Sequence, residues 1–106
     1  MARSSFEHRG KPIEVFSFLG KRWRFRWVDR ASLPRGRFGE CDGPHITKKE
    51  IRVRENLPEK EELEALIHES LHACDWSKDE EWIEQTAGDL ARFIYAQGWR
   101  RNRGDP

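Results

Sequence analysis

Apolar and charged residues alternate near the start of the chain in a pattern that predicts a β-hairpin. Over residues 22–28 every second side chain is aromatic and the intervening ones are arginines, so a strand there would carry the two kinds on opposite faces. The apolar run of residues 12–19 precedes it, and Gly20 and Lys21 supply a turn. A third strand is expected over residues 46–55. The pattern therefore predicts a small antiparallel sheet of about three strands.

Helical periodicity replaces this alternation after Asn56. Apolar side chains then recur three or four residues apart as far as about Trp76, which marks one face of an amphipathic helix. They are Leu63, Leu66, Ile67, Leu71 and Cys74. Asn56 is the expected N-cap of this helix, with Glu59 three residues later. We expect the apolar stripe to face the core.

A second helix is predicted between Ser77 and Gly98. Ser77 followed three residues later by Glu80 has the pattern of a capping box, and glycine commonly ends a helix. The apolar face of this helix consists of Ile83, Thr86, Ala87, Leu90 and Ile94. Together with the strands, these helices predict an α+β fold in which a small sheet is packed with two helices.

The chain has the length of one domain, which we expect over residues 12–99. Residues 1–11 are expected to be a flexible basic arm, and residues 100–106 a flexible tail. Five Trp and six Phe residues supply apolar area for a core. No stretch is long and apolar enough to span a membrane, and the N-terminus lacks the apolar run of a secretory signal, so we expect a cytosolic protein. Cys74 is predicted to fill the core, without a bridge to Cys41.

Charge is distributed unevenly along the chain. Residues 1–37 hold ten Lys or Arg against three Asp or Glu, and residues 38–106 hold ten against sixteen. We interpret this asymmetry mainly as attraction between two halves of the fold. The arginine face of the hairpin could neutralise phosphates, but antiparallel hairpins ordinarily have one charged face, and the aromatic side chains are needed for the core. Contact with nucleic acid is therefore the weaker interpretation.

The stretch from Ile67 to Ala73 carries the candidate chemistry. His68 and His72 are four residues apart, so on a helix their imidazoles lie one turn apart on the same side and can bind one ion. Both fall outside the apolar stripe, which favours a position at a cleft. Glu69 lies beside them, where its carboxylate can act as a general base on a water molecule. This pattern predicts a zinc site with His68 and His72 as ligands and Glu69 as the catalytic residue.

The third ligand should come from the second helix. Glu84 lies at the edge of the apolar face, beside small residues that let the two helices approach. Glu81 points toward solvent, and Glu80 is occupied by the predicted capping box. Glu84 is thus the favoured third metal ligand, with Glu80, Glu81 and Asp75 as alternatives. Asp75 could instead hold a ligating histidine through its free ring N–H.

A long segment rich in Gly and Pro, residues 29–45, is predicted to be a loop. Loops of this length in compact domains are often functional. Cys41, Asp42 or His45 could border the active cleft. Tyr95, the sole tyrosine, is a candidate to stabilise negative charge in the reaction, but its position on the second helix does not assign it that role.

The histidine motif and its surroundings resemble the zincin metallopeptidases. The likeness rests on His68 to Ala73, Asp75, Trp76, Gly98 and Trp99. It is greatest to the short, single-domain metallopeptidase-like proteins common in bacteriophages and prophages, and more distant to SprT-like and ImmA/IrrE-type zincins. The third-ligand histidine of SprT-like proteins has no counterpart, because no His follows His72. In zincins the strand before the motif helix is an edge that can pair with an extended peptide, and the resemblance implies this role for residues 50–54.

These features predict zinc-dependent hydrolysis of peptide bonds, with Zn²⁺ as cofactor and a peptide or protein as substrate. Two alternatives remain at this point. One is a non-catalytic protein-binding module whose small fold is stabilised by the metal. The other is a DNA-associated protease similar to SprT-like proteins, which rests on the arginine strand.

Overall fold

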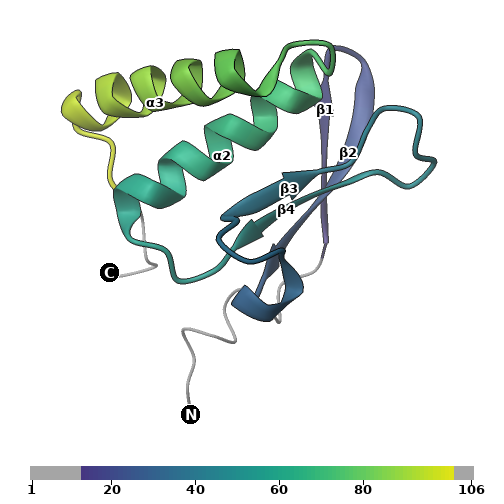
Figure 1. The fold of residues 1–106 in the computed structure, drawn as a ribbon, viewed down its shortest axis with the longest axis horizontal. Coiled ribbons are helices and arrows are strands. Elements are labelled where there is room, and N and C mark those ends of the chain that lie inside the picture. The colour runs from purple at the N-terminus through teal and green to yellow at the C-terminus, as the bar shows by residue number, and fades with distance from the viewer. Residues whose placement is uncertain (1–12, 102–106) are drawn as a thin grey trace.

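A four-stranded sheet forms the amino-terminal half of the protein in this computed structural model, which describes residues 13–101 (Figure 1). Its strands are β1 (Glu14–Phe18), β2 (Lys21–Val28), β3 (Gly39–Cys41) and β4 (Glu50–Arg54), and a short 3-10 helix, η1 (Arg30–Ser32), follows β2. The spatial order is β1-β2-β4-β3. The arm expected over residues 1–11 lies outside the described residues.

The predicted hairpin is formed by β1 and β2, which pair antiparallel. Its turn consists of Leu19 and Gly20, one residue earlier than expected, and both have positive φ, at 50° and 82°. Positive φ at both central residues matches the right-handed twist of the strands in a two-residue hairpin. The alternation along β2 buries Trp23 almost completely, at 1% exposure, while Arg22 on the other face is exposed.

The sheet differs from the prediction in its other two strands. β4 lies between β2 and β3, parallel to β2 and antiparallel to β3. The α+β class is confirmed, but the sheet is mixed and has four strands. Because β4 is internal, residues 50–54 are not the free edge that the resemblance implied, and β3 occupies that edge. β3 falls in the predicted loop, since three residues are too short to show an alternating pattern.

Two helices complete the fold, α2 (Glu59–Cys74) and α3 (Glu80–Ala96). Figure 1 shows α2 lying against one face of the sheet and α3 packed on the other side of α2. Ala65, Glu69 and Ala73, four residues apart, are all buried. The small side chains of Ala65 and Ala73 in this row let α2 approach β3 and β4 closely.

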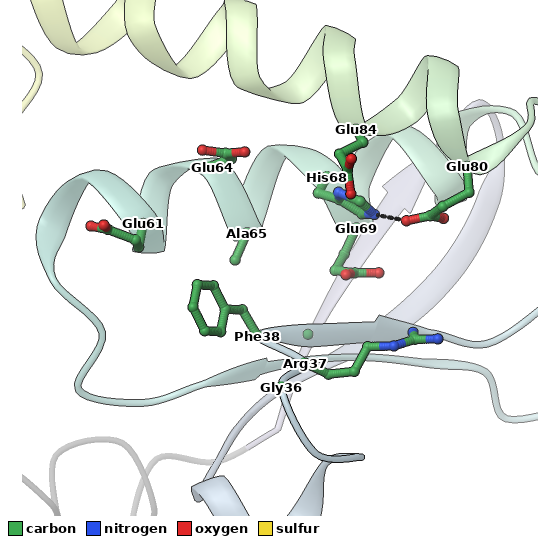
Figure 2. Close-up of a pocket in the computed structure, with 11 residues that line it drawn as sticks. Gly36, Arg37, Phe38, Glu61, Glu64, Ala65, His68, Glu69, Glu80 and Glu84 are labelled. Atoms are coloured by element: carbon green, nitrogen blue, oxygen red, sulfur yellow. Dashed lines mark ion pairs between the residues drawn. The ribbon is translucent and has the colours of Figure 1, made fainter.

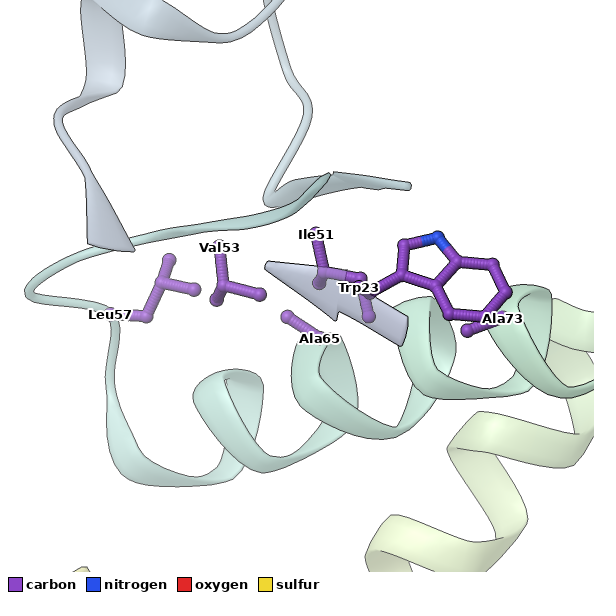
Figure 3. Close-up of a cluster of buried hydrophobic side chains, with 6 residues drawn as sticks. All are labelled: Trp23, Ile51, Val53, Leu57, Ala65 and Ala73. Carbon is purple, nitrogen blue, oxygen red and sulfur yellow. The ribbon is translucent and has the colours of Figure 1, made fainter. Parts of the chain in front are cut away.

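Apolar side chains from the sheet and α2 meet in one buried cluster (Figure 3). It consists of Trp23, Ile51, Val53, Leu57, Ala65 and Ala73. In the predicted apolar stripe of α2, Leu63 is buried but Cys74 is exposed. The prediction that Cys74 fills the core was therefore wrong. A helix held between a sheet and another helix has two buried sides, and a single stripe cannot describe both. Both cysteines are free, as expected.

The start of α2 also differs from the prediction. Asn56 adopts a left-handed conformation, with φ of 63°, and Pro58 directly precedes the helix without a side-chain cap. Asparagine tolerates this conformation better than most residues, so Asn56 turns the chain from β4 toward α2.

The chain beyond α3 folds back onto α2. The backbone N–H of Arg101 donates to Glu59 at 2.8 Å, and its guanidinium pairs with the buried Glu62. Arg100 stacks on the ring of Tyr95 at 3.9 Å. These two arginines begin the expected tail, and residues 102–106 lie outside the described residues. Neither α2 nor α3 is long and apolar enough to cross a membrane.

Candidate metal centre

The two histidines of α2 converge on one carboxylate at the start of α3. His68 Nε2 lies 2.9 Å from Glu80 Oε2, and His72 Nε2 lies 2.9 Å from Glu80 Oε1 (Figure 2 shows the His68 contact). One ligand atom from each of the three residues lies within 4.8 Å of the others. The helical spacing thus places the imidazoles on one side, as predicted from the sequence.

Glu80 reaches the histidines because it is not used in a cap. Asp79, not Ser77, caps α3, and its side chain accepts a hydrogen bond from the Trp82 N–H at 2.7 Å. Ser77 instead donates its hydroxyl to Asp75 at 2.6 Å. Glu80 is therefore the first residue of α3, and its side chain is available to reach back to α2.

The structure does not bring the other candidate ligands into this cluster. Among the described residues, His68, His72 and Glu80 are the group that satisfies the spacing for a metal ion. Glu84, the favoured third ligand, lies one turn further along α3 and lines the neighbouring cleft. Glu81 is exposed, and Asp75 bonds to Ser77 at the end of α2.

A glutamate is buried beside the histidines. Glu69 belongs to the row of α2 that faces the sheet and is only 6% exposed. Burial, followed by the negative charge of Glu80, raises the pKa of Glu69 to about 7. Burying a carboxylate is unfavourable, and strongly perturbed carboxylates tend to cluster at functional sites. A pKa near neutrality suits a group that must accept a proton and later release it.

His72 is electronically suited to hold a metal ion. Burial is the largest effect on its imidazole and lowers its pKa, against the opposing influence of Glu80. A lowered pKa favours the neutral ring, whose free lone pair a metal requires. Two imidazoles and one carboxylate are a donor set used by catalytic zinc sites, which keep a further position for water or substrate.

A cleft runs along the free edge of the sheet beside the three donors. One part, of about 670 Å³, extends from His68 and Glu80 past Phe38 toward the start of α2 (Figure 2). A second part, of about 460 Å³, is lined by both histidines and by Cys41 and Asp42. The structure thus places Cys41 and Asp42 at the cleft, as their position in the long segment 29–45 suggested.

Tyr95 does not line this cleft. It lies near the opposite end of α3, where its ring is covered by Arg100 and faces Lys60 of α2. Sequence reasoning missed several residues that reach the site, among them Arg37 and Gly39. The only sequence signal for them was their place in a long Gly-rich segment.

Gly39 of β3 packs directly on Glu69. A Cβ atom at Gly39 would lie 2.9 Å from Glu69 Cγ and 3.0 Å from the Arg52 carbonyl oxygen. Since a backbone carbonyl cannot easily move, we expect Gly39→Ala to lower the free energy of unfolding by about 1–3 kcal/mol, as overpacking does. Urea unfolding of the variant measures this.

Gly88 provides the matched control. A Cβ there would meet its nearest neighbours, in Arg92 and Glu64, at 3.6 Å, an ordinary contact. Gly88→Ala should therefore stabilise α3 by about 0.5–1 kcal/mol through helix propensity. Equal stability of Gly39→Ala and the wild type would contradict the close packing of β3 on α2.

The raised pKa of Glu69 predicts a pH dependence of stability in the metal-free protein. Between about pH 4.5 and 7 the folded state retains a proton that the unfolded chain has released. The retained proton stabilises the folded state. Its contribution to the free energy of unfolding is complete below the unfolded pKa of Glu69 and is lost as the pH rises through the folded pKa, a total loss of up to about 3 kcal/mol. Urea unfolding of chelator-treated wild type and Glu69→Gln from about pH 5 to about pH 8 isolates it, because the two proteins differ only in this side chain. Parallel curves would contradict the assignment.

Comparisons with known proteins identified no relative of this chain. No family model, no curated protein and no solved structure matches the chain. The function must therefore be argued from the site.

Proposed function

We propose that this protein is a zinc-dependent metallopeptidase of the cytosol, with His68, His72 and Glu80 as the metal ligands. The observation that carries the proposal is the convergence of two imidazole nitrogens on one carboxylate directly beside the buried Glu69. The resemblance of the His68 to His72 motif to zincins supports it. Glu80 replaces Glu84 as ligand in this proposal because it is the carboxylate in contact with both histidines.

A zinc ion bound to these donors supplies a Lewis acid that makes water more acidic and polarises a carbonyl group. The protein's own contribution is proton transfer and positioning. Glu69 is buried next to the donors, so its carboxylate can accept a proton from water and deliver it to the departing amine. The close packing of Gly39 holds its carboxylate in place.

The edge strand β3 suits an extended peptide substrate. Its pairing with β4 uses the hydrogen-bonding groups of alternate residues, as shown by Arg54 N–H donating to Phe38 O and Asp42 N–H to Glu50 O, each at 2.9 Å. The alternation of an antiparallel ladder then turns the backbone groups of Gly39 and Cys41 toward the free edge and the cleft. A peptide can add to such an edge as a further strand.

Metal analysis and melting of the purified wild-type protein test the proposal. We expect about one equivalent of zinc, and an increase in melting temperature on the order of 10 °C over the chelator-treated protein when zinc is in large excess. Hydrolysis of denatured casein should require the metal. A protein that binds no zinc, or that holds zinc without any hydrolysis, would contradict the metallopeptidase assignment.

A further inference from the structure

Arg37 is presented to the cleft by a short, well-defined turn. The backbone N–H of Arg37 donates to the Pro34 carbonyl at 3.0 Å, and Gly36, at the third position of this turn, has φ of +79°. Glycine adopts that conformation without strain, and proline restricts the start of the turn. The turn ends directly before Phe38 and β3, so the backbone of Arg37 is anchored to the edge strand.

The side chain of Arg37 lies across the cleft from the motif helix. It lines both parts of the cleft, together with His68, Glu69 and Glu80. Figure 2 shows it running along β3 on the sheet side, with Glu69 and Glu80 on the helix side. Its positive charge acts on two groups of the site, because it lowers the pKa of both Glu69 and His72, though it is not the largest influence on either.

Arg37 differs from the other arginine of the cleft, Arg52, in having no carboxylate partner. Arg52 forms ion pairs with three residues, Glu40, Asp42 and Glu50, at 2.8–3.2 Å. Its guanidinium donors are thereby engaged. Among residues 13–101, no carboxylate oxygen lies within 4.0 Å of an Arg37 nitrogen. Arg37 is therefore the cleft arginine whose donors are available to a ligand.

We propose that Arg37 is a catalytic residue that donates hydrogen bonds to the carbonyl oxygen of the scissile peptide bond as negative charge develops on it. This inference rests on the proposed function. It assigns the role that Tyr95 cannot fill, since that side chain lies away from the cleft. Donors arranged in advance around a developing oxyanion are commonly the largest single contribution to acyl-transfer catalysis.

The water oxygen forms a bond to the carbonyl carbon while one water proton passes to Glu69, and the π electron pair of the C=O bond moves to the carbonyl oxygen, where Arg37 donates to it. That pair then restores the carbonyl as the C–N bond breaks, and the amine nitrogen takes the proton from Glu69. Arg37 stays protonated throughout, because its guanidinium does not lose a proton in proteins.

The test compares Arg37→Gln, Arg37→Lys and the control Arg35→Gln. Arg35 is on the same turn and exposed, but does not line the cleft. On denatured casein, Arg37→Gln should lower kcat by about 10²–10³-fold with KM within about threefold, and Arg37→Lys should recover part of the loss. A phosphinic pseudo-dipeptide, which carries negative charge on a tetrahedral centre, should bind zinc-loaded Arg37→Gln about 10²-fold more weakly in calorimetry. Zinc content should be the same in all variants.

Three results would overturn the assignment of Arg37. The first is an Arg37→Gln variant whose kcat and phosphinic-peptide affinity equal those of Arg35→Gln. The second is a rise in the KM of Arg37→Gln at unchanged kcat, and the third is loss of zinc from Arg37→Gln. The second would indicate ground-state binding, and the third a role in the metal site. Failure of the proposed function is separate, because it shows in the wild type as absent zinc or absent hydrolysis, and it would remove the Arg37 assignment with it.

Discussion

Glu69→Gln is expected to bind zinc as the wild type does and to hydrolyse peptides about 10²–10⁴-fold more slowly, the range typical for loss of a general base. The substitution preserves the shape of the side chain but removes its ability to accept a proton. Glu69 is not among the three residues whose donors meet, so the metal should be retained. Measurement of kcat together with zinc content by elemental analysis checks both parts.

The same variant separates an enzyme from a binding module. In a module stabilised by metal, Glu69 would have no chemical role, and Glu69→Gln would leave function intact. Gly88→Ala serves as control, since Gly88 does not line the cleft and its substitution should change neither kcat nor zinc content. Full hydrolysis by Glu69→Gln would remove the general-base role.

His68→Ala and Glu80→Gln are each expected to weaken zinc binding by about 10²-fold or more. Zinc binding to a protein site contributes on the order of 10 kcal/mol, and one of three ligands accounts for about 3 kcal/mol of it, which corresponds to about 10²-fold in affinity. Competition with a chromogenic chelator measures the dissociation constant.

Glu84→Gln is the matched control for Glu80→Gln. Both residues are on α3 one turn apart and line the same cleft, but only Glu80 contacts the histidines. Glu84→Gln should therefore bind zinc as the wild type does. Loss of zinc from Glu84→Gln, with retention by Glu80→Gln, would restore Glu84 as the ligand. Equal metal content in His68→Ala and the wild type would argue against the site itself.

The identity of the carboxylate at the histidines shows where local reasoning failed. Ser77 and Asp79 are both suitable N-caps, and an N-cap contributes only about 1 kcal/mol, so the sequence cannot choose between them. The folded chain uses Asp79, because Ser77 is engaged by Asp75 in the turn after α2. This shift of two residues releases Glu80 from the expected cap and brings it to His68 and His72.

The features readable from the sequence were those with a short repeat. Alternation placed Trp23 on the buried face of β2, and helical spacing placed His68 and His72 on one side of α2 with Glu69 beside them. A strand repeats every two residues and a helix every 3.6, so each pattern needs only neighbouring positions.

Strand order, depth of burial and the far wall of the cleft were decided by tertiary contacts. β3 became the free edge only because β4 inserts between it and β2, a pairing of segments distant along the chain. Gly39 packs on Glu69, which is 30 positions later in the sequence, and Arg37 faces the motif helix from the turn before β3. Residue periodicity predicts which face of a helix or strand is apolar. It does not predict which other element packs against that face, because the packing partner depends on the free energy of the whole folded chain.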